Sequence, residues 1–167
     1  MSLELVYGYD RPAEIASLFS EYTDFLIRVM PAFGTSLEQQ NYSAEYENPG
    51  AKYALPGGRL YIAMVDGEGA GCVALRRIDD ERGELKRMYV RPAYRGQRIG
   101  RAMAERIIRD AGDIGYRYVM LDTEPCLESA VRLYESLGFR RCPRYNDSPF
   151  DTTIFMQYEL AKASSLR

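Results

Sequence analysis

Hydrophobic residues follow a helical spacing in the first part of the chain. Between residues 11 and 30, apolar side chains recur every three or four positions, which predicts an amphipathic helix. Pro12 lies near its start and Pro31 ends it. Residues 3–9 alternate and predict a strand, and residues 35–46 predict a second, more polar helix.

From residue 59 the pattern changes to the alternation that is typical of strands. Residues 59–65, 71–78 and 84–90 each predict a strand. Asp66-Gly67 and residues 79–83 predict the turns between them. The middle of the chain is therefore expected to form an antiparallel meander.

The last third of the chain mixes both periodicities. The expected elements are a helix at 99–111, a strand at 118–123, a helix at 127–137 and strands at 139–145 and 153–160. Gly138 closes the second helix, and the turn-rich stretch YNDSPFD joins the last two strands. The pattern predicts one α+β domain in which helices pack on a mixed sheet.

Composition fits a globular chain and excludes several classes of protein. Hydrophobic residues make up 46% of the 167 and charged residues 28%, and no apolar run approaches the roughly 18 residues that a membrane helix needs. The N-terminus lacks the features of a signal peptide. The three cysteines form no CxxC pair, which favours a reducing compartment, so we expect a cytoplasmic protein.

The chain contains no histidine. Ordinary Ser-His-Asp and Cys-His catalysis is therefore excluded, as is every metal site that needs histidine, and we expect no metal. Any chemistry must use carboxylates, tyrosine, cysteine, lysine or the backbone.

Charge is unevenly distributed along the chain. Residues 86–109 hold eight Lys/Arg and one acidic residue, whereas the remainder holds 14 basic and 23 acidic residues. Such a basic island favours one anionic ligand over a nucleic acid, which would need a broader positive surface. A nucleic-acid binder stays open and would show steep salt dependence.

The stretch YRGQRIGRA lies at the centre of this island, between a predicted strand and a predicted helix. A helix N-terminus presents unpaired N–H groups and therefore binds phosphate readily. Gly96 and Gly100 permit close approach, and Arg95, Arg98 and Arg101 carry suitable charge. Neither GxxxxGK[ST] nor GxGxxG is present. A surface turn with solvated arginines is the alternative.

The preceding strand, ELKRMYV, is unusually polar for the interior of a meander. Glu84 and Lys86 share one face, which we expect to border a wet cleft where Glu84 serves as a general base. The alternative is an exposed edge that carries a surface ion pair.

The run ELKRMYVRPAYRGQRIGRAMAERII, followed by YVMLDT and SAVRLYESLGF, resembles the GNAT superfamily of acyl-CoA N-acyltransferases. In the family signature Q/R-x-x-G-x-G/A, Arg95 takes the first position and Gly100 the last, whereas Arg98 replaces the inner glycine. The resemblance covers residues 59–160. It implies a single GNAT-like domain over residues 1–167, with a mostly antiparallel sheet splayed at the cofactor site and helices on both faces. Residues 1–58 would supply acceptor-side helices and residues 59–160 the acyl-CoA-binding core.

The resemblance also implies roles for particular residues. The pyrophosphate of acetyl-CoA would lie on Arg95, Gly96, Gln97, Arg98, Ile99, Gly100 and Arg101. Backbone groups at a bulge, at Met88, Tyr89 and Val90, would hold the pantetheine and polarise the thioester. Glu84 would be the general base, and Tyr134 would protonate the departing thiolate. Leu127 stands where many relatives have a cofactor-binding asparagine.

The chemistry agrees with the residues available. A protonated alkylamine needs a base, the thioester oxygen needs an N–H donor, and the thiolate accepts a proton from a phenol. Tyr134 also lies on the apolar stripe of its helix, where a core role is the alternative. Cys126 lacks a histidine to activate it, so direct transfer is favoured over a covalent route.

The acceptor is expected to bind to the N-terminal helices and to the loop between the last two strands. These regions hold Tyr22, Phe25, Phe33, Tyr42 and Tyr46 with Glu21, Asp24, Glu38, Glu45 and Glu47, and then Tyr145, Asn146, Asp147 and Phe150. Aromatic and acidic groups suit a cationic amine. A solvated helix face is the alternative.

The sequence thus predicts an acetyl-CoA-dependent N-acetyltransferase for a primary amine of a small molecule or amino-acid-like acceptor, with no nucleic-acid or membrane partner. A non-catalytic CoA-binding module, a protein N-acetyltransferase and a homodimer stay open. We expect the backbone at Arg98 to be already helical, so that no glycine is needed there and the guanidinium reaches a phosphate. Arg98→Gly is then expected to weaken CoA binding.

Overall fold

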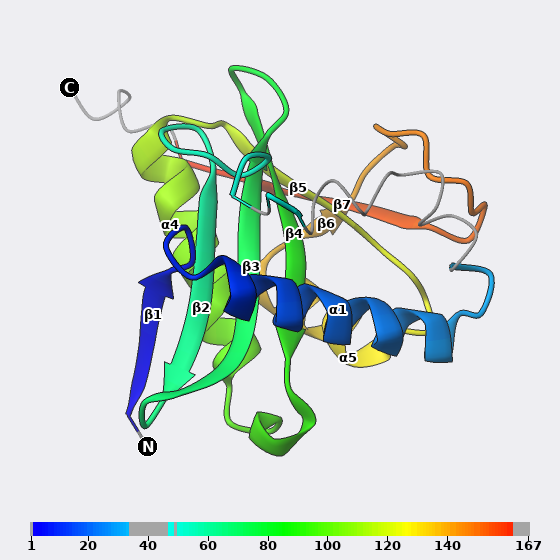
Figure 1. The fold of residues 1–167 in the computed structure, drawn as a ribbon. Coiled ribbons are helices and arrows are strands. Elements are labelled where there is room, and N and C mark those ends of the chain that lie inside the picture. The colour runs from blue at the N-terminus through cyan, green and yellow to red at the C-terminus, as the bar shows by residue number, and fades with distance from the viewer. Residues whose placement is uncertain (1, 34–46, 49, 162–167) are drawn as a thin grey trace.

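The computed structural model describes residues 2–33, 47–48 and 50–161, and in these residues the chain folds around one seven-stranded sheet. The strands are β1 (Leu3–Tyr7), β2 (Arg59–Val65), β3 (Glu68–Arg77), β4 (Arg82–Val90), β5 (Tyr118–Thr123), β6 (Arg140–Arg141) and β7 (Ile154–Glu159). The helices are α1 (Pro12–Val29), α4 (Ile99–Ile114) and α5 (Glu128–Leu137), with a 3-10 turn, η1, at Pro92–Tyr94. The strand order is β1-β2-β3-β4-β5-β7-β6 (Figure 1).

Neighbouring strands run antiparallel except for β4 and β5, which are parallel. These two strands pair only at their beginnings, where residues 82–84 of β4 meet residues 118–120 of β5. The later residues of β5 pair with β7 on the other side. The two strands therefore diverge, as Figure 1 shows, and the sheet opens between them.

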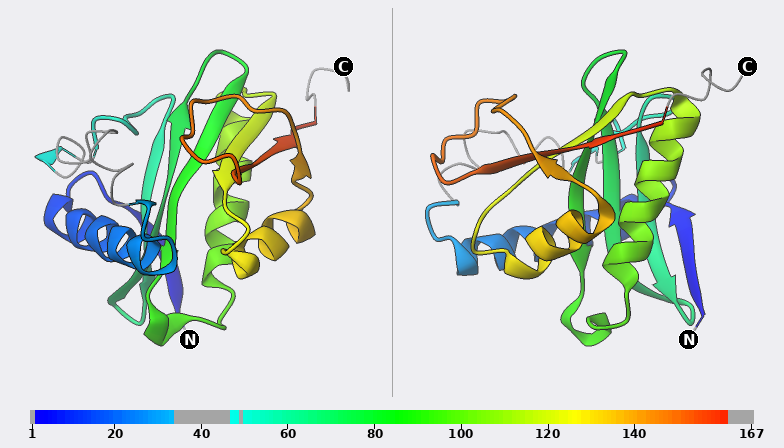
Figure 2. Two further views of the ribbon diagram at one scale, coloured as in Figure 1. Left: turned by 90° about the vertical axis from the view of Figure 1, so that its right-hand side faces the viewer. Right: turned by 180° about the vertical axis from the view of Figure 1, so that it is seen from behind.

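The helices cover both faces of the sheet. Figure 2 shows α4 and α5 on one face and α1 on the other. Successive side chains of β2 point to opposite faces of the sheet and contribute to both core layers. Leu60 and Ile62 are buried with α1, whereas Tyr61 and Ala63 are buried with α4. Burial against the same face of the sheet explains the amphipathic pattern of α4, since Ile99, Met103 and Ile107 lie in the core layer between this helix and the sheet.

Most predicted elements are present. The strands at 59–65 and 118–123 have the predicted bounds, and the helices at 11–30, 99–111 and 127–137 are found within three residues of theirs. The predicted helix at 35–46 lies outside the described residues. The α+β class is confirmed.

The strand predicted at 139–145 is wrong in its extent, because only Arg140 and Arg141 pair with β7. The N–H of Cys142 still donates to the carbonyl of Phe155 on β7 (2.9 Å). Beyond Cys142 the backbone leaves the sheet, and the guanidinium of Arg144 donates hydrogen bonds to the carbonyls of Ser148 (2.9 Å) and Phe150 (3.2 Å). Those internal contacts form a loop in place of a strand.

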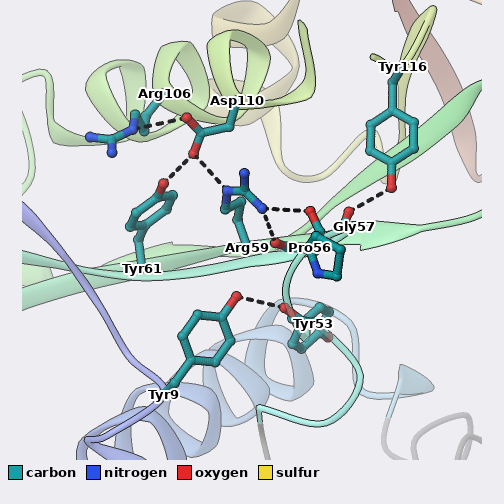
Figure 3. Close-up of polar contacts among 10 residues, drawn as sticks. Tyr9, Tyr53, Pro56, Gly57, Arg59, Tyr61, Arg106, Asp110 and Tyr116 are labelled. Carbon is teal, nitrogen blue, oxygen red and sulfur yellow. Dashed lines mark hydrogen bonds and ion pairs between the residues drawn. The ribbon is translucent and has the colours of Figure 1, made fainter. Parts of the chain in front are cut away.

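A partly buried polar network joins α4 to β2 and to the segment before it (Figure 3). Asp110 accepts a short hydrogen bond from the hydroxyl of Tyr61, a second one from Nε of Arg106 (3.2 Å), and lies 3.6 Å from Nε of Arg59. Arg59 in turn donates to the carbonyl of Gly58 (2.7 Å). This network holds the chain that enters β2 against the helix that follows the predicted phosphate loop.

No helix in the described part of the chain is long and apolar enough to cross a membrane. Among those same residues, no group of three or more Cys, Asp or Glu side chains is arranged to hold a metal ion.

Candidate active site

The divergence of β4 and β5 opens a cavity of about 390 Å³. It is bordered by α1 and by the loop between β6 and β7 as well as by the two strands. Its polar and charged lining residues are Tyr22, Lys52, Arg76, Glu84, Lys86, Arg87, Asp122, Thr123, Glu124, Tyr134, Asn146, Asp147 and Ser148. Its apolar lining residues are Leu26, Met30, Phe33, Leu85, Met88, Leu127, Pro149 and Phe150. The volume suits a small molecule.

A bulge in β4 shapes one wall of this cavity. The pairing with β3 shifts register between Cys72 and Ala74, and Arg87 adopts a left-handed backbone with φ 57°. Such a bulge re-aims side chains and bends the strand. The bulge therefore begins at Arg87, one residue before Met88, which is the first of the three residues predicted to form it.

The strand edge beyond the bulge faces the opening. Since the N–H of Arg91 donates to the carbonyl of Ala70 on β3 (2.8 Å), and amides alternate along a strand, the N–H of Val90 is expected to face the opposite edge. The Met88 side chain lines the cavity, whereas the ring of Tyr89 is buried against α1. Of the three predicted residues, Met88 and Val90 thus have groups at the opening.

Glu84 lines the cavity but is only 1% exposed. Its Oε1 accepts hydrogen bonds from Nε (3.1 Å) and a terminal nitrogen (2.9 Å) of Arg76, and its Oε2 accepts one from the Tyr145 hydroxyl (2.5 Å). Nζ of Lys86 lies 3.8 Å away. The face shared by Glu84 and Lys86 therefore borders a cavity, as predicted, and is not an exposed edge.

The electrostatics around Glu84 keep it ionised. Burial alone would raise the pKa of this carboxyl group, but Lys86, the Tyr145 hydroxyl and Arg76 outweigh burial and lower the pKa below its ordinary value. A base with a lowered pKa is less efficient, although the carboxylate can still accept a proton through water.

Tyr134 is both a core residue and a cavity residue, so its two alternative roles are compatible. It lies on α5, where its ring packs edge-on against Phe139 at 5.7 Å between centroids. It also lines the cavity. Burial and the neighbouring Tyr22 and Asp122 raise the pKa of its hydroxyl far above the ordinary value, so the phenol keeps its proton at neutral pH.

The predicted phosphate loop leads into the N-terminus of α4. The N-cap residue, Arg98, makes no capping hydrogen bond with its side chain, so the first N–H groups of the helix are left available for an anion. Gly96 has φ 80°, and an added Cβ there would meet nothing within 4 Å. Side chains of Leu133, Val90 and Met88 lie nearest to Gly100. Through Met88 the loop adjoins the cavity.

Two of the three loop arginines are bound within the protein. Arg95 donates to the carbonyl of Val90 (3.1 Å) and lies 5.1 Å from the ring centroid of Phe25. Arg101 donates to the hydroxyl of Ser136 (3.1 Å) and pairs with Glu105 (3.1 Å). Their charge still adds to the field at the loop, but their guanidinium groups have protein partners.

Arg98 corrects one expectation. Its backbone is left-handed, with φ 61° and ψ 23°, and not the right-handed helix expected for this position. The position therefore does favour glycine, and the arginine bears strain there. Its side chain is exposed, and within the described part of the chain its guanidinium has neither a hydrogen bond nor an ion pair.

The predicted acceptor-side residues divide into several groups. Those that line the cavity are Tyr22, Phe33, Asn146, Asp147 and Phe150. Tyr42, Tyr46, Glu38 and Glu45 lie outside the described residues. Outside the cavity, Glu21 pairs with Arg91 (2.8 Å), Phe25 lies against Arg95, and Asp24 and Glu47 are exposed.

Sequence reasoning missed several charged groups of the cavity. Lys52, Arg76, Arg87, Asp122 and Glu124 were given no role, although all five line the cavity. Asp122 carried a usable signal, since it is a carboxylate within the apolar strand YVMLDT. Arg87 carried no such signal, because regular alternation along a strand assigns its side chain to the face opposite Lys86.

Cys126 gives no support to a covalent route. Its thiol is exposed, and desolvation together with the carboxylate of Glu124 raises its pKa above the ordinary value. Reactive cysteines have the opposite surroundings, which lower the thiol pKa.

Comparisons with known proteins agree with this geometry. The model of the family described as "Acetyltransferase (GNAT) family" matches residues 18–139. An uncharacterized N-acetyltransferase of Schizosaccharomyces pombe is 37% identical over 132 residues, which cover 78% of this chain and 81% of the relative. The N-acetylaspartate synthetase of Danio rerio is 39% identical over 99 residues, covering 58% of this chain but only 35% of that protein.

Solved structures share the fold. The PaiA N-acetyltransferase of Thermoplasma acidophilum, solved in complex with coenzyme A, has a TM-score of 0.75 at 16% identity, covering 96% of this chain and 100% of that one. An acetyltransferase of the GNAT family from Staphylococcus aureus has a TM-score of 0.73 at 20% identity, with the same coverage. The splayed sheet with helices on both faces is therefore the fold of these acetyltransferases.

Proposed function

The chain belongs to the GNAT acetyltransferase family of acyltransferase enzymes, and on this premise we propose that it transfers an acetyl group from acetyl-CoA directly to a primary amine of a small molecule or amino acid. One observation carries the proposal. The opening between β4 and β5 places Glu84, Tyr134 and the free edge of β4 around one cavity, beside the uncapped N-terminus of α4.

The cofactor side of the site is formed by the core of residues 59–160. Backbone N–H groups from Gln97 to Arg101 and the guanidinium of Arg98 would bind the pyrophosphate, because a helix N-terminus favours anions. Acetyl-CoA supplies the acetyl group as an activated thioester. The edge at Met88 and Val90 would hold the pantetheine arm and donate an N–H to the carbonyl oxygen of the thioester.

The remaining chemistry needs one base and one acid. Glu84, through a water molecule, would take a proton from the ammonium of the acceptor so that its nitrogen can attack the carbonyl carbon. As the carbon–sulfur bond breaks, the phenol of Tyr134 gives its proton to the sulfur. The second proton of the nitrogen leaves as the amide forms and restores the phenol through solvent.

Calorimetric titration with acetyl-CoA tests the first part of this function, and an acceptor screen by thiol release tests the second. We expect micromolar binding and turnover with at least one primary amine. Absence of binding at high micromolar acetyl-CoA would contradict the cofactor assignment. Acetylation of hydroxyl acceptors alone would contradict the amine.

A further inference from the structure

The loop between β6 and β7 reaches across β5 to Glu84 on β4. Its residue Tyr145 packs edge-on against Phe155 of β7, with 5.4 Å between the ring centroids. The amide of the next residue, Asn146, donates to Asp122 of β5 (2.6 Å), which is the cross-strand partner of Phe155. These two contacts hold the loop over β5 and place the Tyr145 hydroxyl where it donates to Oε2 of Glu84 (2.5 Å).

The other oxygen of Glu84 is held from β3. Arg76 lies directly opposite Glu84 in the β3–β4 register, and its Nε (3.1 Å) and a terminal nitrogen (2.9 Å) both donate to Oε1. Nζ of Lys86 lies 3.8 Å from the same oxygen. The two oxygens therefore differ, because cations surround Oε1 whereas a neutral hydroxyl holds Oε2.

Hydrogen-bond capacity distinguishes the two oxygens further. Each carboxylate oxygen has about two lone-pair sites. Arg76 occupies both sites of Oε1, and Tyr145 occupies one site of Oε2. Within the described residues, the second site of Oε2 is the one left over. Since Glu84 lines the cavity although it is only 1% exposed, this site is where a water molecule in the cavity would bind the carboxylate.

Tyr145 is suited to orient Glu84 and not to replace it. Burial, together with the carboxylates of Glu84 and Asp122, raises the pKa of the Tyr145 hydroxyl far above its ordinary value, so the phenol keeps its proton and remains a donor. A neutral donor directs a carboxylate without cancelling its charge. Tyr145 is not one of the described residues that line the cavity, so any effect on the reaction passes through Glu84.

We propose that Tyr145 is a positioning residue for the transfer, and that its hydroxyl holds Oε2 of Glu84 as the oxygen that accepts the acceptor's proton. This inference rests on the proposed function and adds a residue and an oxygen to it. The acceptor's ammonium gives a proton to a bridging water, and that water gives a proton to Oε2, while the phenol of Tyr145 keeps its own. Without the hydroxyl, the carboxylate is held at Oε1 alone and can turn about its bonds to Arg76.

A double-mutant cycle tests the proposal, with thiol release from acetyl-CoA as the assay and the primary amine that the acceptor screen identifies as the substrate. Tyr145→Phe should lower kcat about tenfold, because a misplacement of about 1 Å can cost about a hundredfold and Arg76 still holds Oε1. In Glu84→Gln the same change should alter kcat by less than about twofold, since no base is left to position. An equal loss in both backgrounds would overturn the inference.

A matched tyrosine separates this role from general packing. Tyr158 lies on β7, and its ring packs against Phe139 at 5.5 Å between centroids. Tyr158→Phe also removes one hydroxyl from this side of the sheet and should leave kcat unchanged in both backgrounds. If Tyr145→Phe has as small an effect as Tyr158→Phe in an active enzyme, the inference is overturned and the proposed function stands. No thiol release by the wild type would overturn the proposed function and the inference with it.

The pH profile of kcat gives an independent readout. The charged and titratable groups around the pair are Arg76 from β3, Lys86 on β4, Asp122 from β5 and Cys142 before the loop, with Tyr22 and Tyr134 across the cavity. All of them remain in Tyr145→Phe. Burial raises the pKa of Glu84, and Lys86, the Tyr145 hydroxyl and Arg76 lower it by more.

Loss of the hydroxyl should therefore raise the pKa of Glu84. Because the base acts when ionised, the fall of kcat in acid should begin at a higher pH in Tyr145→Phe than in the wild type and in Tyr158→Phe. A purely structural role of Tyr145 would lower kcat at every pH and leave this limb in place, and that result would overturn the inference.

Discussion

Arg98→Gly separates two roles of one residue, because the structure assigns Arg98 both a strained backbone and a guanidinium free of protein partners in the described chain. A left-handed residue other than glycine costs roughly 1–2 kcal/mol. Glycine removes this strain but adds about 0.5–1 kcal/mol of entropy to the unfolded chain. The variant should therefore be more stable by roughly 0.5–1 kcal/mol, or about 1–4 °C in Tm for a domain of this size.

Binding should change in the opposite direction. The guanidinium would form a charge-assisted hydrogen bond with a phosphate of CoA, and such bonds contribute roughly 1.5–3 kcal/mol. Because Arg98 is exposed, solvent screening reduces this contribution, and we expect a loss of about 1.4 kcal/mol, which is tenfold in Kd. Calorimetry with acetyl-CoA and thermal denaturation without ligand measure the two effects separately.

Arg98→Ala is the matched control, since it removes the guanidinium but keeps a Cβ at positive φ. It should lose as much affinity as Arg98→Gly without gaining stability, whereas Arg98→Lys should keep most of the affinity. Unchanged or tighter binding by Arg98→Gly would refute the phosphate contact. Equal Tm values for the glycine and alanine variants would refute the argument from strain.

Three other substitutions test the site and its support. Glu84→Gln should lower kcat about a hundredfold and leave the Kd of acetyl-CoA within a factor of about two; unchanged kcat would remove Glu84 as the base. Because the pKa of Glu84 is lowered in the folded state, its stabilising contribution is present above the unfolded pKa of about 4.3 and is lost as pH falls through the folded pKa, so the wild-type advantage in Tm over Glu84→Gln should shrink in acid. Tyr134→Phe should lower kcat with cofactor affinity retained, and a loss of affinity alone would indicate a packing role. Asp110→Ala leaves the Tyr61 hydroxyl unpaired and should cost about 2–3 kcal/mol, seen as a lower Tm with normal kcat per folded molecule; reduced kcat at unchanged Tm would contradict a structural role.

The spacing of hydrophobic residues along the sequence was sufficient to predict most of the helices and strands. The strands at 59–65 and 118–123 were predictable because most of their residues are buried, and a run of hydrophobic residues marks this burial directly. The two-residue strand β6 was overestimated, because its continuation looks like a strand in composition while Arg144 binds the loop's own carbonyls. Local hydrogen bonds of this kind leave no periodic signal.

The site was harder to predict, since its main features arise where regular geometry fails. Glu84 and Lys86 could be assigned to a cavity face from alternation, and the structure places both there. Arg87 could not, because the bulge reverses its direction. Arg98 was assigned the wrong backbone, because nothing in a single sequence distinguishes an arginine that tolerates strain from one in a helix.

The β4 bulge connects these observations physically. Where β4 leaves β5, the residues from Leu85 onward have no ladder partner on that side, so an extra residue can be inserted without loss of hydrogen bonds to β5. The same insertion brings Arg87 beside Lys86 and leaves the edge at Val90 facing the opening. Deleting Arg87 should therefore restore regular alternation, because Lys86 and Met88 already point to opposite faces, and it should straighten β4 and shift the edge at Val90. Acetyl-CoA affinity should then fall, whereas Lys86→Met, which keeps the bulge, should leave this affinity within a factor of about two; calorimetry measures both, and an unchanged affinity after the deletion would contradict the role of the bulge.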